Sequence, residues 1–239
     1  MRAKEKVSAS VARLVARQAD VIVAASDAIA EEALGLEPAG VVTTILNGAD
    51  FDDFAGLEYR RGDRFRITHT GSFFGKRDPR PFLSALAESG LQDVVARFVG
   101  DFRVADRDWA EPLGLGDRLE LLPHVSRREA LALQRDSDAL LLLIPDAGGR
   151  GQGVLSGKVF EYLAAEPPEG AAAELIRETG AGVVAAPDDV PALTRALTEL
   201  HAAWAAGSLD GTALSAEDRE RLGRGARVEE LAEVLRGLA

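Results

Sequence analysis

Short apolar runs rich in β-branched residues alternate with amphipathic segments along most of this chain. The apolar runs have the length of strands, and we expect strands at 20–24, 41–46, 65–71, 94–100, 118–123, 139–144 and 182–186. The run ALLLLI is continuously apolar, which is typical of a strand covered on both faces. The alternation predicts an α/β fold with a doubly wound, mostly parallel, Rossmann-like sheet.

Residue patterns at the segment ends predict where helices begin. Ser26 is a suitable N-cap for one helix, and Ser126 with Glu129 three residues later forms a capping box for another. The expected helices cover 2–18, 26–34, 78–89, 126–136, a segment that starts near 157, 171–180, 189–205, 215–223 and 226–238. The turn-rich stretch 47–64, which begins with Asn-Gly, is expected to be a hinge or boundary.

Composition argues against several functional classes. The chain has 239 residues and a formal net charge of −11, so no basic footprint dominates and we expect no nucleic-acid partner. It has no cysteine, which excludes disulfides and thiolate chemistry. The longest apolar run is too short to span a bilayer, and the N-terminus lacks the apolar core of a signal peptide. We therefore expect a cytoplasmic protein, with peripheral membrane contact left open.

The loop 70–79, TGSFFGKRDP, follows an expected strand and could bind an anion. Ligands of open α/β sheets bind beyond the carboxyl ends of the strands. Gly71 permits close approach of a ligand, and Lys76 and Arg77 stand just before a helix N-terminus. This combination suits a diphosphate. The alternative interpretation is a solvated turn whose basic residues keep it soluble.

The second candidate loop, 145–162, carries five glycines between 148 and 157 and leads into a helix. At 100° per residue, Lys158, Glu161 and Tyr162 share one face of that helix, and apolar residues share the other. Glu161, one turn into the helix, could accept hydrogen bonds from a pair of sugar hydroxyls. It could also serve only the helix dipole, with Lys158 as its partner.

Spacing disfavours other kinds of site. The second loop nearly matches a phosphate-binding P-loop, but Gln152 stands where that motif needs glycine and Val159 where it needs Ser or Thr. Neither loop has the full dinucleotide fingerprint, and no nucleophile elbow is present. The three histidines are scattered, so we expect no metal and no cofactor.

Six ordered blocks of sequence resemble the retaining GT-B glycosyltransferases of family four. They are QADVIVAASDAIAEEAL, VVTTILNGADFDDF, ITHTGSFFGKRDPRPFLSAL, LPHVSRREALALQRDSDALLLLI, SGKVFEYLAA and ELIRETGAGVVAAPDDVPAL. Together they cover nearly all of the chain, which resembles the C-terminal, donor-binding half of such enzymes. The resemblance is closest to members with Lys-x-x-Glu-Tyr in the donor-site helix.

The resemblance implies an enzyme that transfers a sugar, with retention, from a UDP- or GDP-sugar to an unknown acceptor. It implies that Arg77, with Lys76 as a possible substitute, stabilises the leaving diphosphate without a protein nucleophile or a metal. The implied donor-binding residues are Gly71, Ser72, Val99, Gly100, His124, Val125, Leu155, Ser156, Gly157, Lys158 and Glu161. Among them, the Gly71 N–H would face the diphosphate, and Glu161 would bind the ribose hydroxyls. The backbone at 124–125 would read the nucleobase.

The resemblance also implies a domain division. Residues 1–46 would be the remnant of an N-terminal acceptor domain, 47–225 the nucleotide-sugar-binding domain and 226–239 a C-terminal helix. A missing N-terminal domain or a partner chain would complete the enzyme. Family members place a short strand after the donor-site helix, yet none fits where Glu166 meets Pro167, so we expect residues to be missing there.

Two departures from the family pattern leave other functions open. Ser72 stands where members often carry Arg, and Gly153 stands where many carry a second Glu. The alternatives are a non-catalytic nucleotide-binding or assembly module and a GT-B-fold sugar-nucleotide epimerase. Acid and base residues of an epimerase are not evident in the sequence.

Overall fold

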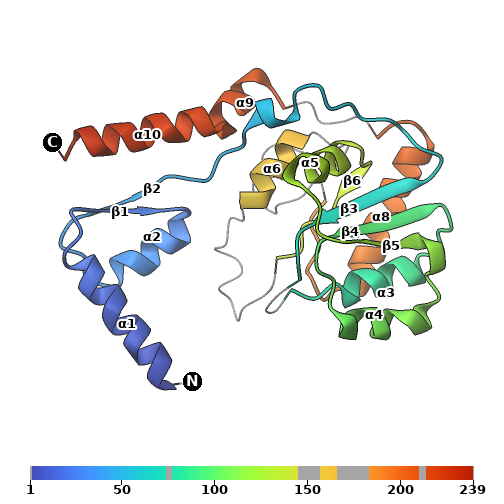
Figure 1. The fold of residues 1–239 in the computed structure, drawn as a ribbon, viewed down its shortest axis with the longest axis horizontal. Helices are drawn as coiled ribbons and strands as arrows, with labels where there is room; N and C mark the ends of the chain where they lie inside the picture. The colour runs from blue at the N-terminus through green and yellow to red at the C-terminus, as the bar shows by residue number, and fades with distance from the viewer. Residues whose placement is uncertain (1, 74–76, 145–156, 166–182, 210–213, 239) are drawn as a thin grey trace.

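The structure, a computed structural model, describes residues 2–73, 77–144, 157–165, 183–209 and 214–238. In this part of the chain the strands form a two-stranded and a four-stranded parallel sheet (Figure 1). The first sheet belongs to an N-terminal unit of α1 (Arg2–Ala16), β1 (Val21–Ala24), α2 (Asp27–Leu34) and β2 (Val41–Thr44). The predicted cap is confirmed, because the Ser26 hydroxyl accepts a hydrogen bond from the Ile29 N–H at 3.3 Å.

The four-stranded sheet has the strand order β5-β4-β3-β6. Its strands are β3 (Phe65–Thr70), β4 (Val94–Val99), β5 (Leu119–Leu122) and β6 (Ala139–Leu140). In chain order these are the third, second, first and fourth strands of the sheet, which is how the first four strands of a Rossmann fold are ordered. The winding direction reverses between β3 and β6, so the expected ligand crevice lies beyond the carboxyl ends of these two strands.

Helices cover both faces of this sheet (Figure 1). One face carries α3 (Arg80–Glu88), α4 (Val104–Ala110) and α8 (Val190–Ala205), and the other carries α5 (Arg127–Arg135) and α6 (Gly157–Ala165). Successive residues of β6 show the double coverage, since Ala139 belongs to the core under α3 and Leu140 to the core under α6. The predicted doubly wound, parallel α/β fold is thus confirmed.

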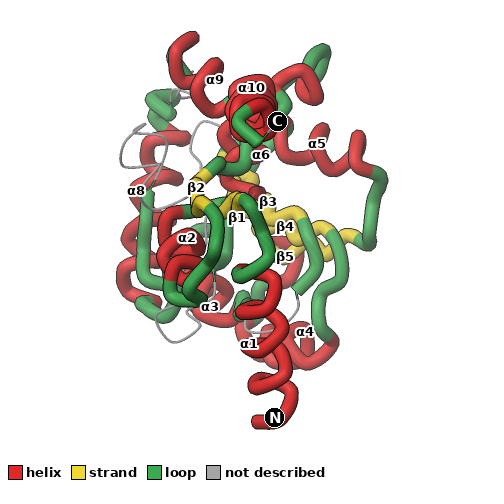
Figure 2. Tube along the Cα trace, turned by 90° about the vertical axis from the view of Figure 1, so that its left-hand side faces the viewer, coloured by secondary structure: helices red, strands yellow, loops and turns green. Residues whose placement is uncertain are grey.

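The C-terminal helices return to the segment that connects the two sheets. They are α9 (Ala216–Leu222) and α10 (Arg224–Arg236), and in Figure 2 they lie at the opposite end of the view from α1. The Ala49 N–H donates to Leu222 O at 2.8 Å, and the Arg224 N–H donates to Ala49 O at 2.7 Å. The boundary expected at 225 falls inside α10, and the domain division itself stays a prediction. In the described part of the chain, no helix is long and apolar enough to cross a membrane.

The elements differ from the predictions in several places. Strand β6 has two residues instead of the six expected at 139–144, and 183–186 has no strand. Helix α4 was not anticipated by the periodicity. Among the described residues, connections contain the 3-10 helices η1 (Phe51–Phe54), η2 (Glu111–Leu113) and η3 (Gly116–Arg118). The helix expected at 171–180 and the junction of Glu166 with Pro167 lie outside the described residues.

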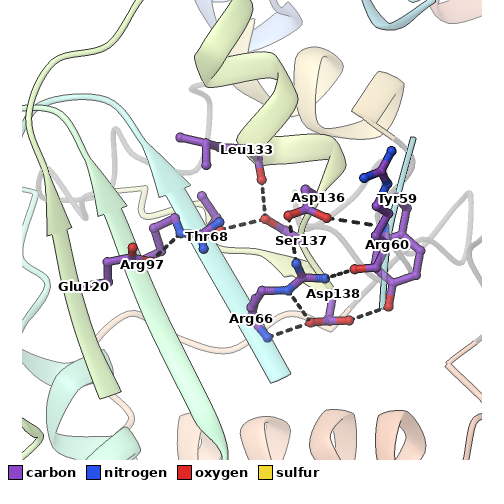
Figure 3. A network of polar contacts seen from close by, with 10 residues as sticks. All are labelled: Tyr59, Arg60, Arg66, Thr68, Arg97, Glu120, Leu133, Asp136, Ser137 and Asp138. Carbon is purple, nitrogen blue, oxygen red and sulfur yellow. Dashed lines mark hydrogen bonds and ion pairs between the residues drawn. The ribbon is translucent and has the colours of Figure 1, made fainter. Parts of the chain in front are cut away.

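A buried polar network ties the connecting segment to the amino end of the sheet (Figure 3). The fully buried carboxylate of Asp138 accepts a hydrogen bond from the Arg66 backbone N–H at 2.7 Å and another from the Tyr59 hydroxyl. The Arg66 guanidinium also pairs with Asp136 at 2.8 Å and donates to the Arg60 carbonyl oxygen. Arg66 is the second residue of β3 and Asp138 precedes β6, so this network lies at the amino end of the sheet, opposite to the ligand crevice.

Candidate functional site

The ladder of backbone hydrogen bonds between β3 and β6 ends at the crevice, because side chains there bond to the backbone groups that would continue it. The Leu141 N–H still donates to Thr68 O at 2.9 Å. In a regular parallel ladder the Thr70 N–H would then donate to Leu141 O. Instead the Thr70 N–H donates to the Tyr162 hydroxyl at 2.9 Å, and His69 Nδ1 lies 2.8 Å from Leu141 O. This replacement explains why β6 is short and why the sheet opens at its switch point.

Lys158, on the first turn of α6, enters the same opening. Its Nζ donates to the carbonyl oxygen of Thr70, which a regular ladder would pair with a backbone N–H. A Cβ atom on Gly71 would lie 1.8 Å from this Nζ, and the Gly71 φ of +123° also favours glycine. Burial and the nearby charge of Arg77 lower the pKa of Lys158, whereas Glu161 opposes this shift. A desolvated cation therefore lies at the carboxyl end of β3.

A buried acid, Asp106, holds the arginine that supports the backbone of the loop at Arg77. Asp106, which is 1% exposed, accepts hydrogen bonds from Arg80 Nε at 2.9 Å and from Arg103 Nε. Arg103 Nη2 in turn donates to the carbonyl oxygen of Arg77 at 2.9 Å. The backbone at Arg77 is therefore fixed relative to α4. The Arg77 guanidinium is close enough to Lys158 for the two charges to interact.

Glu161 lies between two donors from α5. Its Oε1 accepts a hydrogen bond from Gln134 Nε2 at 2.7 Å, and its Oε2 pairs with Arg127 Nη1 at 3.1 Å. Gln134 Nε2 also donates to Thr70 Oγ1 at 2.9 Å, so the carboxylate is connected to the end of β3. The sequence suggested Lys158 as a possible partner of Glu161 and did not indicate these two contacts. Tyr162 was wrongly placed on the polar face, because it is fully buried with its hydroxyl against Thr70.

A small open pocket of about 50 Å³ adjoins Glu161. Its walls come from the connecting segment, from the first turns of α5 and α6 and from the start of α10. The lining residues are Gly48, Ala49, Asp50, Asp53, Phe54, Arg127, Gly157, Glu161 and Arg224. Two of them, Gly157 and Glu161, were predicted as donor-binding residues. The pocket is rich in charge of both signs, which suits a polar ligand with several hydrogen-bonding groups.

The glycines at the ends of β3 and β4 belong to the ladder. The Gly71 N–H, which was expected to face a diphosphate, donates to Val99 O at 2.7 Å. The Gly100 N–H donates to Leu122 O at 3.0 Å. The contact between the Gly71 N–H and a diphosphate stays a prediction, and in this structure that donor bonds to the sheet. The glycine instead makes room for Lys158.

Three further predicted residues that the structure describes follow the carboxyl ends of β3 and β5. Ser72 exchanges hydrogen bonds with Asp101, since its Oγ donates to Oδ2 and accepts from the backbone N–H, both at 3.1 Å. His124 is exposed and Val125 half-buried after β5, and neither lines the pocket around Glu161. Lys76, Leu155 and Ser156 lie outside the described residues.

Sequence reasoning missed the residues that hold Glu161 and the switch point. These residues come from three elements that lie far apart in the sequence, so no single motif joins them: Arg127 and Gln134 from α5, His69 and Thr70 from β3, and Asp53 from η1. One local signal existed, because the capping box at Ser126 is confirmed and fixes the start of α5 just before Arg127. No three acidic or histidine side chains gather to hold a metal among the described residues.

Known structures share this fold, although no protein-family model and no curated protein matches the sequence. Sucrose-phosphate synthase from Thermosynechococcus elongatus matches with a TM-score of 0.66 and 18% identity over 98% of this chain and 62% of that one. Anabaena HepE in complex with UDP matches with a TM-score of 0.71 and 17% identity over 98% of this chain and 69% of HepE.

A UDP-forming α,α-trehalose-phosphate synthase from Burkholderia vietnamiensis matches with a TM-score of 0.63 and 14% identity, over 92% of this chain and 62% of that one. The chain thus spans about two thirds of the length of each of these proteins. At these identities the similarity concerns the fold. The chain has the Rossmann-like α/β fold found in the GT-B glycosyltransferases.

Proposed function

We propose that this chain is the donor-binding part of a retaining, family-four-type glycosyltransferase that uses a UDP- or GDP-sugar. One observation carries the proposal: α6 brings the Lys158 cation and the Glu161 carboxylate to the switch point beyond β3 and β6, beside Arg77. A nucleoside diphosphate needs cations for its phosphates and an acceptor for its ribose hydroxyls. The bound UDP in HepE, which has a similar fold, supports this choice of ligand.

The proposed chemistry is electrostatic. Arg77 and Lys158 stabilise the negative charge that develops on the diphosphate as the bond to the sugar breaks. Because Lys158 is partly desolvated, its attraction to a phosphate is stronger than it would be in water. An arriving diphosphate also favours the charged form of Lys158, which opposes the effect of burial on its pKa. The resemblance adds Lys76 as a substitute for Arg77.

Two different parts of the protein bind the ribose and the nucleobase of the donor in this proposal. Glu161 accepts hydrogen bonds from the ribose hydroxyls, since its carboxylate adjoins the pocket. The backbone at 124–125, beyond β5, reads the nucleobase, an assignment carried over from the resemblance. The acceptor would bind to an N-terminal domain or partner chain that completes the enzyme. The cytoplasmic location also stays a prediction.

Calorimetric titration with UDP, GDP and their sugars tests the proposal. The wild type should bind at least one of them, and Glu161→Ala should weaken binding about tenfold or more, because hydrogen bonds to a charged group are lost. Glu233→Ala removes the same charge from the exposed surface of α10 and should leave binding unchanged. No heat with any of these ligands would overturn the proposal.

A non-catalytic nucleotide-binding module is the second candidate. It is favoured by Ser72, which stands in place of an expected Arg and bonds to the carboxylate of Asp101. The two candidates differ in donor turnover. A transferase should slowly hydrolyse its bound sugar nucleotide, with water taking the glycosyl group and UDP or GDP leaving, and Arg77→Ala should abolish that release. Binding without any release of the nucleoside diphosphate, in the presence of the completing domain, would favour the module.

A further inference from the structure

Arg127 connects two carboxylates at the edge of the pocket. Its Nη1 lies 3.1 Å from Glu161 Oε2, and its Nη2 donates to Asp53 Oδ2. Arg127 belongs to the first turn of α5, Glu161 to α6, and Asp53 to η1 in the connecting segment. All three side chains line the pocket. One guanidinium therefore joins the three segments that form the pocket wall.

The contacts of Arg127 complete a fixed setting for the Glu161 carboxylate. On the buried side, Gln134 Nε2 holds Oε1 at 2.7 Å, and Gln134 is itself 1% exposed. On the solvent side, Arg127 holds Oε2. A carboxylate has about four acceptor positions, so two positions remain for a ligand after these bonds form. The arrangement orients the carboxylate without using up its capacity to accept hydrogen bonds.

Electrostatics gives Arg127 a second effect on Glu161. Asp50 and Asp53 line the same small pocket, so Glu161 stands among other negative charges. Like charges that line one pocket repel one another and push their side chains apart. The Arg127 guanidinium between Asp53 and Glu161 offsets this repulsion. Asp53 in turn raises the pKa of Arg127 and fixes where its guanidinium lies.

We propose that Arg127 is a positioning residue of the donor site: it holds the Glu161 carboxylate for the ribose hydroxyls of a nucleoside diphosphate, and Asp53 anchors it there. The inference rests on the proposed function, because it requires Glu161 to bind ribose. The inference adds two residues to the proposed donor site, Arg127 from α5 and its anchor Asp53 from the connecting segment. Arg127 acts through Glu161, so its effect should appear only where a ligand carries the hydroxyl that Glu161 recognises.

Paired titrations with UDP and 2′-deoxy-UDP isolate this effect, with GDP and 2′-deoxy-GDP in their place if the site prefers guanine. The wild type should bind the ribonucleotide about tenfold or more tightly than the deoxynucleotide, as expected for a hydrogen bond to a charged group. Arg127→Ala should reduce this ratio at least about threefold, and Arg127→Lys should restore part of it because one charged contact is regained. Arg128→Ala, an exposed neighbour with the same charge, should keep the wild-type ratio.

The double variant Arg127→Ala/Glu161→Ala gives a further test. If Arg127 works through Glu161, the double variant should show the same ratio as Glu161→Ala alone. Arg127 is an exposed residue and Glu161 a partly exposed one, so we expect all variants to fold. Thermal unfolding of each variant checks this. The inference would be overturned if Arg127→Ala kept the wild-type preference for the ribonucleotide over the deoxynucleotide while Glu161→Ala lost it. The proposed function would then still stand. Wild-type protein that binds neither ribonucleotide would overturn both.

Discussion

The ammonium group of Lys158 occupies the space that a side chain at residue 71 would need. A Cβ atom on Gly71 would lie 1.8 Å from Lys158 Nζ and 3.1 Å from Cε. The same Nζ donates to the carbonyl oxygen of Thr70, the residue before that glycine. The glycine in the first loop and the lysine in the second are thus two halves of one arrangement, although the sequence separates them widely.

Gly71→Ala should therefore both destabilise the fold and weaken nucleotide binding. The φ of +123° disfavours any side chain, and Lys158 must also leave its place, so we expect a loss of about 1–3 kcal/mol in the free energy of unfolding. Gly90→Ala is the control, since its φ is also positive at +68° but nothing lies within 4 Å of the added Cβ. Urea unfolding and UDP titration should show a larger effect for Gly71→Ala, and equal binding by both variants would contradict this role.

Tyr162→Phe should destabilise the switch point without removing apolar surface. The variant loses the oxygen that accepts the Thr70 N–H at 2.9 Å, and the helix α6 packs over this buried donor. Leaving a buried N–H without a partner reduces stability by about 1–3 kcal/mol. Urea unfolding at neutral pH measures the change. A free energy of unfolding equal to that of the wild type would show that the ladder bond re-forms to Leu141.

His69 should make the protein less stable in mild acid. Burial lowers its pKa from 6.5 to about 4, and the charges of Lys158 and Arg77 act in the same direction. Between these values the unfolded chain binds more protons, so stability is lost as the pH falls from 6.5 towards 4, by up to roughly 3 kcal/mol. In His69→Gln, the drop in unfolding free energy from pH 7 to pH 4.5 should be smaller. Identical drops would rule out His69 as the source.

Asp138→Ala should be strongly destabilising, because it leaves the Arg66 guanidinium half-satisfied beside a buried gap. Removing one partner of a buried ion pair reduces stability by about 3–5 kcal/mol. Asp117→Ala breaks the pair between Arg64 and an 87% exposed carboxylate, and we expect a change below about 1 kcal/mol there. Chemical denaturation compares the two. Since the network lies at the opposite end of the sheet, the folded fraction of Asp138→Ala should still bind UDP, and lost binding would contradict this separation.

Local patterns were sufficient for the general architecture. Strand–helix alternation predicted the parallel sheet, and the Ser126 capping box with Glu129 is present in the structure. The helix that carries Glu161 was also expected from its periodicity. These features depend on neighbours within a few residues, where hydrophobic period and backbone hydrogen bonds are set by adjacent side chains.

Only the tertiary structure decided how the switch point is built. Tyr162 shares its helical face with Glu161 by periodicity, yet it is buried because its hydroxyl satisfies a backbone donor 92 residues away. The strand expected at 139–144 stops after two residues because His69 bonds to Leu141 O in place of the ladder. Arg127 and Asp53 meet Glu161 only once α5, α6 and η1 have packed together. Hydrogen bonds between distant side chains leave no periodic trace in the sequence, so the sequence determined the sheet and its helices, and packing determined the site.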